Sequence, residues 1–235
     1  MALGSGKGPD FAPEPFTASY RRELRLGLRA QARKALRLLR ARLQALPKPV
    51  RPEAARVLAA ERRILALFDA ALQRPLEARR IRAHGDLHLG QVLFTGKDFI
   101  FIDFEGEPAR APSERRLKRS PLYDAAGMLR SFHYAAQSAR QERRFSEAAA
   151  ELWAQQAGDA FLKAYLSRAH TGGFLPSDPV QIQALLDVFC LEKALYELIY
   201  ELNHRPAWVR IPLRGILRAL EGSSGGGPES CKIQK

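Results

Sequence analysis

Apolar side chains recur every three or four residues along most of the chain, with charged residues between them. This spacing places the apolar positions on one face of an α-helix and predicts that the face is buried. The first such segment runs from about Ala18 to Leu46, and Pro47 and Pro49 end the pattern. Its apolar stripe consists of Leu24, Leu28, Ala32, Leu36, Leu39 and Leu43. Further helices are expected over residues 52–72, 124–137, 147–168, 180–203 and 213–220.

The segment between residues 80 and 102 has a different pattern. Short apolar runs bounded by turn residues predict strands over residues 80–84, 92–94 and 99–102, and Gly96 with Lys97 forms a turn between the last two. The expected fold class is therefore α+β and mainly helical, with a small β-hairpin sheet inside the helical chain.

The two ends of the chain do not continue the helical pattern. Residues 1–17 are rich in Gly and Pro and predict an extended connector with apolar anchors at Phe11 and Phe16. Residues 222–227 form a Gly/Ser-rich linker, and residues 222–235 are expected to be disordered. The folded domain is thus expected over residues 18–221.

The composition indicates a folded protein with a strong positive charge. Of the 235 residues, 46% are apolar and 9% are aromatic, which suits a chain with a sizeable core. The formal net charge is +13, with 29 Arg against 9 Lys. Such a charge attracts nucleotides, phosphates and other polyanions, and the attraction weakens as salt is added.

The cysteines and the length of the apolar runs indicate the cellular compartment in which the protein is expected. Cys190 and Cys231 are the only cysteines, and their positions do not predict a disulfide framework. No signal peptide opens the chain, and no apolar run is long enough to span a membrane. We therefore expect a cytoplasmic protein without a membrane partner.

One pair of motifs has a spacing typical of phosphoryl transfer. Asp86 lies five residues before Gln91, and the run Asp103-Phe104-Glu105 follows the predicted hairpin. Protein kinases use the same layout: a catalytic-loop aspartate, an amide ligand five residues later, and an Asp-Phe metal motif after a short hairpin. The spacing predicts a kinase-like active site.

The residue types suit the steps of such a transfer. The Asp86 carboxylate can accept the proton of an attacking hydroxyl or orient its oxygen. Gln91 supplies a neutral amide oxygen and Asp103 a charged one, which suits a hard ion such as Mg²⁺. Glu105, two residues after Asp103, can bind a second ion or a bound water. The predicted site is thus Asp86 as catalytic base, with Gln91, Asp103 and Glu105 at the metal.

Other interpretations of these loop residues stay open. A loop aspartate such as Asp86 is often a turn or cap residue. His84 and His88 are four residues apart, a spacing that suits a metal pair on a helix, but Gly85 disfavours a helix here. His84 is instead expected to brace the loop through hydrogen bonds.

A cluster of basic residues follows the acidic motif. These side chains either face phosphates or acidic partners, or form a solvated loop, and the sequence does not decide between the two. The cluster consists of Arg110, Arg115, Arg116, Lys118 and Arg119.

Taken together, these motifs resemble those of the maltokinase family, a branch of the aminoglycoside-phosphotransferase-like, protein-kinase-like fold. Residues 84–93 are similar to that family's catalytic loop, with Gln91 where many relatives in the wider fold carry Asn. Residues 102–108 are similar to its metal motif. The resemblance covers nearly all of residues 9–221 and also includes residues 11–17, 114–116, 118–122, 124–132 and 192–201.

The resemblance implies ATP-dependent phosphorylation of maltose at its anomeric hydroxyl, which gives maltose 1-phosphate for the synthesis of glycogen and other α-glucans. It implies ATP as co-substrate and Mg²⁺ as cofactor, with Asp86 as base, Gln91 and Asp103 as ligands and Glu105 nearby. Some members of the family are fused to a trehalose synthase, which is therefore an expected partner domain.

Sugar contacts are expected on a helix near the end of the chain. Four residues lie there at three- and four-residue spacings, so several can face a cleft together. Aromatic rings suit sugar faces and carboxylates suit hydroxyls, while the alternative is a packing face with solvated acids. The four residues are Tyr196, Glu197, Tyr200 and Glu201.

Members of this family also have an N-terminal lobe that binds the nucleotide. We expect no counterpart of that lobe in this sequence. Residues 1–17 would be a connector from that lobe, residues 18–221 a kinase-like C-terminal lobe, and the other lobe would be lost or encoded as a separate partner. The alternatives are a kinase for another sugar or an amino sugar, an inactive fragment, and a basic binding module. Nucleic acid is not expected as a partner, because aromatic interleaving and a recognised binding motif are absent.

Overall fold

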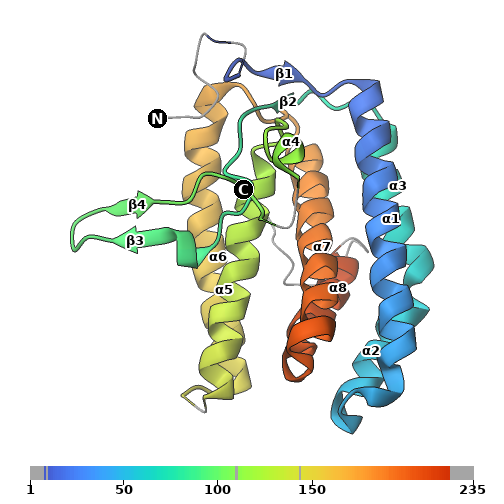
Figure 1. The fold of residues 1–235 in the computed structure, drawn as a ribbon. Coiled ribbons are helices and arrows are strands. Elements are labelled where there is room, and N and C mark those ends of the chain that lie inside the picture. Colours follow the sequence, from blue (N-terminus) through green and yellow to red (C-terminus); the bar gives the residue numbers. More distant parts are fainter. Residues whose placement is uncertain (1–7, 9, 109–110, 143, 223–235) are drawn as a thin grey trace. The chain divides into compact units, whose positions relative to one another are not determined.

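Each half of the fold is assembled from two separate stretches of sequence (Figure 1). The computed structural model describes residue 8 and residues 10–108, 111–142 and 144–222. Among these residues, the first unit combines residues 8–16 with Leu76–Ile182, and the second combines Thr17–Pro75 with residues 183–222. The expected disorder of residues 223–235 and the Gly-rich start at residues 1–7 lie outside the described residues.

The second unit is helical. Helices α1 (Ala18–Arg42) and α3 (Glu61–Gln73) lie side by side, and α2 (Arg51–Ala59) packs on α8 (Arg210–Gly222). Helix α7 (Pro179–His204) begins in the first unit and continues through the second. The helices predicted over residues 18–46, 180–203 and 213–220 are confirmed, with shifted ends.

The predicted apolar stripe of α1 supplies much of this core. Leu28, Ala32 and Leu39 are at most 3% exposed, and Ile64 and Phe68 of α3 are fully buried. Burying a large aliphatic or aromatic side chain contributes about 1.5–3 kcal/mol. A salt bridge at the edge of this core joins the same two helices: Arg29 of α1 donates to Asp69 of α3. Periodicity alone therefore identified the face that packs.

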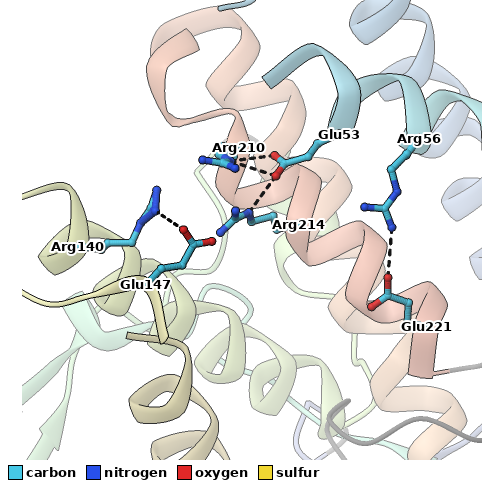
Figure 2. Close-up of polar contacts among 7 residues, drawn as sticks. All are labelled: Glu53, Arg56, Arg140, Glu147, Arg210, Arg214 and Glu221. Atoms are coloured by element: carbon cyan, nitrogen blue, oxygen red, sulfur yellow. Dashed lines mark hydrogen bonds and ion pairs between the residues drawn. The ribbon is translucent and has the colours of Figure 1, made fainter. Parts of the chain in front are cut away.

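The helix predicted over residues 52–72 is in fact two helices. The break lies at Ala60, where ψ is 7° and the backbone leaves the α-region. Glu53 of α2 accepts hydrogen bonds from Arg210 and Arg214 of α8, at 3.1 and 3.2 Å, and Figure 2 shows all three side chains converging. Helix α2 packs mainly on α8 and α3 mainly on α1, so the segments on either side of the break have different main partners.

Two long helices dominate the first unit. Helices α5 (Leu122–Gln141) and α6 (Glu147–Ala169) pack side by side, and Ser146 caps the start of α6 by accepting the Ala149 N–H at 3.2 Å. Small residues permit the close approach. A Cβ at Gly158 would meet the Leu129 Cδ2 atom at 3.3 Å, so even alanine there would require the Leu129 side chain to shift by a few tenths of an ångström. The helices predicted over residues 124–137 and 147–168 are confirmed.

Two small antiparallel sheets complete the first unit. Strand β1 (Glu14–Pro15) pairs with β2 (Arg79–Arg80), and β3 (Val92–Phe94) pairs with β4 (Phe99–Phe101). The β3–β4 hairpin extends away from α5 and α6 as an arm (Figure 1). The predicted hairpin and the mainly helical α+β class are confirmed.

The strand predicted over residues 80–84 is shorter than expected. After Arg80, Ile81 makes one antiparallel bridge with Arg119, and the backbone N–H of His84 then donates to a side chain, that of Asp124. The ladder therefore ends before residue 84. Short α- and 3₁₀-helical turns join the other elements: α4 (Pro112–Arg115), Leu43–Ala45, Lys48–Val50, Leu89–Gln91, His170–Gly172 and Pro206–Trp208.

None of the helices in the described part of the chain combines the length and the apolarity needed to cross a membrane.

Candidate functional site

The loop that carries Asp86 is fastened to the first turn of α5. The Asp124 carboxylate accepts the backbone N–H of His84 at 2.7 Å and that of Gly85 at 2.9 Å. Nearby, the Tyr165 hydroxyl donates to the Pro121 carbonyl at 2.8 Å. Burial, and secondarily the charge of Asp124, raise the pKa of Tyr165, so this donor stays protonated. The start of α5 is thus a fixed support for the loop.

The His84 side chain links the loop to the acidic motif. It is 3% exposed, and its Nδ1 accepts the Asp86 N–H at 3.4 Å. Its Nε2 therefore carries the proton and donates to the Ile102 carbonyl at 2.8 Å. The ring packs against Phe104 with centroids 4.7 Å apart. These contacts support the predicted bracing role of His84 and engage both of its ring nitrogens, one in the loop and one at the acidic motif.

Asp86 lies between this buried histidine and a more open one. Its side chain is 24% exposed, and its Oδ2 lies 4.0 Å from the His88 Nε2. His88 also accepts the Gly90 N–H through Nδ1, at 3.1 Å. The backbone of Asp86 is thus tied to His84, while its carboxylate reaches solvent, as a group that takes a proton from a substrate requires.

Gln91 and Asp103 are brought together by the hairpin. Val92 pairs with Phe101, and the Ile102 N–H donates to the Gln91 carbonyl at 3.0 Å, so the two side chains leave the sheet at the same end. The Gln91 Nε2 donates to the Asp103 Oδ2 at 2.9 Å. The Gln91 Oε1 and the Asp103 Oδ1 are hard oxygen atoms that take no part in this hydrogen bond.

Asp103 also has an unusual backbone. Its φ is 62°, and it is the only non-glycine residue with positive φ in the described ranges. That conformation costs about 1 kcal/mol or more for a residue with a Cβ, and such strain is found most often at functional sites. The turn directs the Asp103 carboxylate to the Gln91 amide.

Glu105 takes a different partner from the other predicted metal ligands. Its Oε2 lies 3.6 Å from the Arg115 Nη1, while Arg115 also donates to the Pro108 carbonyl at 2.9 Å. No group of three or more His, Cys, Asp or Glu side chains suited to a metal forms among the described residues. Gln91 and Asp103 are therefore the predicted ligands that meet, and the metal role of Glu105 stays a prediction.

Two glycines let the catalytic loop and the acidic motif approach each other. Gly85 and Gly106 have φ of 87° and 82°, and a Cβ at Gly85 would lie 3.3 Å from the Gly106 Cα. A side chain at either position would be strained. The catalytic loop and the acidic motif are thus in backbone contact at these two glycines.

Sequence reasoning assigned no role to two residues that hold this loop. Asp124 binds the two amides described above, and the Ser131 Oγ accepts the Leu89 N–H at 2.9 Å. Both lie on α5, seven residues apart, so they share a helix face. The sequence does show an acidic residue in the first turn of this helix and a serine seven residues later. This pattern does not indicate which backbone segment the two side chains bind.

The four predicted sugar contacts lie on α7, in the second unit. Glu201 is 1% exposed and binds Arg205 through both carboxylate oxygens, at 2.6 and 3.0 Å. Tyr200 is 44% exposed and packs against His204, with ring centroids 4.7 Å apart. Tyr196 and Glu197 are half-buried one turn earlier. The sugar-binding role of these residues stays a prediction.

Comparison with known sequences places these features in a family. A model of the phosphotransferase enzyme family (APH) matches residues 10–165, which include the whole of the loop, the hairpin and α5. A glucosamine kinase of Mycolicibacterium smegmatis (strain ATCC 700084 / mc(2)155) is 36% identical over 134 residues, or 56% of this chain and 32% of that protein. A glucosamine kinase of Streptacidiphilus jiangxiensis is 28% identical over 150 residues, or 63% and 33%.

Solved structures show the same fold. A glucosamine kinase in complex with glucosamine, ADP and inorganic phosphate matches with a TM-score of 0.73 and 22% identity, over 90% of this chain and 50% of that one. Crystal form B of a glucosamine kinase matches with a TM-score of 0.75 and 22% identity, over 90% and 48%. The chain spans about a third of the curated relatives and about half of the solved structures.

Proposed function

Because the chain belongs to the phosphotransferase enzyme family, we propose that it carries the catalytic loop and metal-binding segment of an ATP-dependent kinase that phosphorylates an amino sugar. One observation carries this proposal: Gln91 and Asp103 meet at 2.9 Å beside a loop that presents Asp86, with the spacing that phosphoryl transfer uses.

Asp86 is the proposed catalytic base. As the acceptor hydroxyl attacks the γ-phosphorus of ATP, its proton passes to the Asp86 carboxylate, a bond forms between oxygen and phosphorus, and ADP leaves. General-base catalysis of this kind contributes about 10²–10⁴ in rate. Positioning matters as much, because phosphoryl transfer depends on aligning the attacking oxygen. The hydrogen bonds of His84 and Asp124 give the loop that rigidity.

The oxygen donors at Gln91 and Asp103 fit Mg²⁺. One neutral and one charged oxygen suit an ion that keeps several waters and takes phosphate oxygens as further ligands. Gln91 and Asp103 would hold the ion, which when bound neutralises charge on the phosphates. Arg115, by pairing with Glu105, limits the negative charge beside them.

Glucosamine is the proposed acceptor in preference to maltose. The curated relatives that match 56% and 63% of the chain are both named glucosamine kinases, and this supports the amino-sugar alternative over the maltose implied by the motif resemblance. An amino sugar carries an ammonium group near neutral pH, and carboxylates are its natural partners. We propose that Tyr196, Glu197 and Tyr200 supply the sugar contacts, whereas the fourth predicted residue, Glu201, is buried and bound to Arg205 and is not proposed as a contact.

An acceptor panel tests this function. ADP formation is measured with ATP and Mg²⁺ in the presence of glucosamine, maltose, glucose or no sugar, and ³¹P NMR identifies the phosphorylated product. The proposal expects stimulation by glucosamine above the no-sugar rate and a smaller effect of maltose. Stimulation by maltose alone would overturn the choice of acceptor, and no stimulation by any sugar would overturn the proposed activity.

A further inference from the structure

A cavity of about 510 Å³ lies in the first unit beside the β1–β2 pair. Its polar lining comes from four basic side chains, Arg80, Arg82, Arg116 and Lys118, and two acidic ones, Asp10 and Glu14. None of the proposed catalytic or metal-binding residues lines it. Its volume is in the range of small-molecule sites, about 300–1,000 Å³.

Two of the basic groups are already paired at the cavity wall. The Glu14 Oε1 lies 2.8 Å from the Lys118 Nζ, and its Oε2 lies 2.7 Å from the Arg80 Nη2. Lys118 is 7% exposed. The hydrogen bond from Lys118, together with the charges of Arg80 and Lys118, holds the pKa of Glu14 below its ordinary value against the opposing effect of burial. Glu14 is therefore ionised and fixes both cations.

Arg82 and Arg116 provide the remaining positive charge. The Arg82 Nη1 donates to the Arg116 backbone carbonyl at 3.2 Å, which holds the two residues together. Neither guanidinium has a carboxylate within ion-pair distance among the described residues. With Asp10 as the other acid, the lining carries four positive and two negative groups, a net charge of +2.

The rest of the lining is apolar. Phe11 is 45% exposed and Leu117 is 55% exposed, so both present open surface at the cavity. Aromatic and aliphatic faces of this kind suit the C–H face of a sugar ring. The cavity thus combines an apolar wall with two guanidinium groups that have no carboxylate partner among the described residues.

We propose that this cavity binds a phosphorylated sugar, with the phosphate between Arg82 and Arg116 and the ring against Phe11 and Leu117. Arginine is suited to this task because its planar fork matches phosphate oxygens in pairs. The structure also separates the members of the basic cluster, whose role the sequence did not decide. Arg116 and Lys118 turn to the cavity, Arg115 turns to Glu105, Arg119 stacks over Tyr123, and Arg110 lies outside the described residues.

The site is independent of the proposed kinase reaction, and its test needs neither ATP nor Mg²⁺. Isothermal titration of the full chain with glucose 6-phosphate at low salt should show one saturable site. The double variant Arg82→Gln/Arg116→Gln should weaken binding at least about tenfold, since each charge-assisted contact contributes about that factor. The matched control is Arg33→Gln/Arg37→Gln, which removes the same charge from two exposed positions on α1 and should leave affinity within about threefold.

Three outcomes overturn the proposal: no saturable binding by the wild-type chain, an equal loss in both double variants, or inorganic phosphate binding as tightly as glucose 6-phosphate. The last result would remove the sugar ring from the site, and Phe11→Ala should in contrast weaken glucose 6-phosphate more than inorganic phosphate. Circular dichroism verifies that each variant is folded. If the double variant does not fold, Arg116→Gln alone is used, because that side chain is exposed.

Discussion

The carboxylate of Asp124 accepts the backbone N–H of His84 at 2.7 Å, across 40 residues of sequence. Its second oxygen accepts the next amide, that of Gly85, at 2.9 Å. One side chain on α5 thereby satisfies two consecutive donors shortly after the bridge between Ile81 and Arg119. The position of Asp86, the next residue, follows from this anchor, because the two preceding peptide groups cannot rotate without breaking a bond to a charged acceptor.

Asp124→Asn should loosen the loop without removing the packing of α5. Asparagine keeps one acceptor but places an NH₂ group against one of the two N–H donors. Because a hydrogen bond to a charged group contributes about 1.5–3 kcal/mol, we expect a loss of about that size in the free energy of unfolding. Amide hydrogen exchange at His84 and Gly85 should accelerate. The control Asp98→Asn, in the exposed turn of the hairpin, should leave exchange at these two amides unchanged.

The backbone of Asp103 should affect the stability of the fold, and its carboxylate should affect metal binding. Its φ of 62° favours glycine, so Asp103→Gly should be more stable than Asp103→Ala by about 1 kcal/mol. Both variants lack the carboxylate and should bind Mn²⁺, used as a probe for Mg²⁺, much more weakly than wild type. Urea unfolding and electron paramagnetic resonance of Mn²⁺ measure the two effects. Equal stability of the two variants would show that the backbone at residue 103 is unstrained.

Local patterns predicted the helices and the hairpin better than they predicted the site. The stripe from Leu28 to Leu39 and the turn at Gly96 are short-range features, so periodicity and turn chemistry suffice for them. The break at Ala60 could not be predicted in this way, because the apolar pattern continues through it and the different main partners of α2 and α3 lie far away in the sequence.

The same limit explains which parts of the site were missed. Asp86, Gln91 and Asp103 have a characteristic spacing, and the hairpin that joins Gln91 to Asp103 is local. The support from Asp124 and Ser131 and the positive φ of Asp103 depend on contacts between distant segments. Glu14 likewise binds Arg80 and Lys118, and each of these partners lies more than 60 positions away in the sequence. No single-segment pattern carries that information.

Asp187 on α7 should make stability depend on pH. Burial raises the pKa of its carboxyl to about 6, against a smaller opposing effect of the hydrogen bond from Gln183. A carboxyl with a higher pKa in the folded chain contributes stability that is complete below its unfolded pKa of 3.8 and is lost as pH rises through about 6. Asp187→Asn should therefore be more stable than wild type by about 1–3 kcal/mol at pH 7.5, and the difference should vanish near pH 4. Thermal unfolding across this range tests it, and a difference that does not change with pH would contradict it.

The exposed apolar side chains of the β3–β4 hairpin should promote association between molecules of this protein. Leu93 and Ile100 lie opposite each other and are 49% and 51% exposed. Exposed apolar strands of this kind promote association. Leu93→Thr/Ile100→Thr should lower the fluorescence of the apolar dye ANS and the rate of aggregation, while changing the melting temperature little because both side chains are already solvated. Val180→Thr, which removes an apolar side chain that is 74% exposed elsewhere, should have a smaller effect.

The most direct test of the central claim is the glucosamine-dependent rate of ADP formation by the wild-type chain and by Asp86→Asn, at saturating ATP and Mg²⁺. Asparagine matches the shape of the carboxylate but cannot accept the substrate proton, so the rate should fall at least about 100-fold. Asp98→Asn, an exposed aspartate on the hairpin turn, should retain the wild-type rate. A rate in Asp86→Asn equal to that of wild type would contradict the account, and so would a wild-type chain whose ADP formation does not respond to glucosamine.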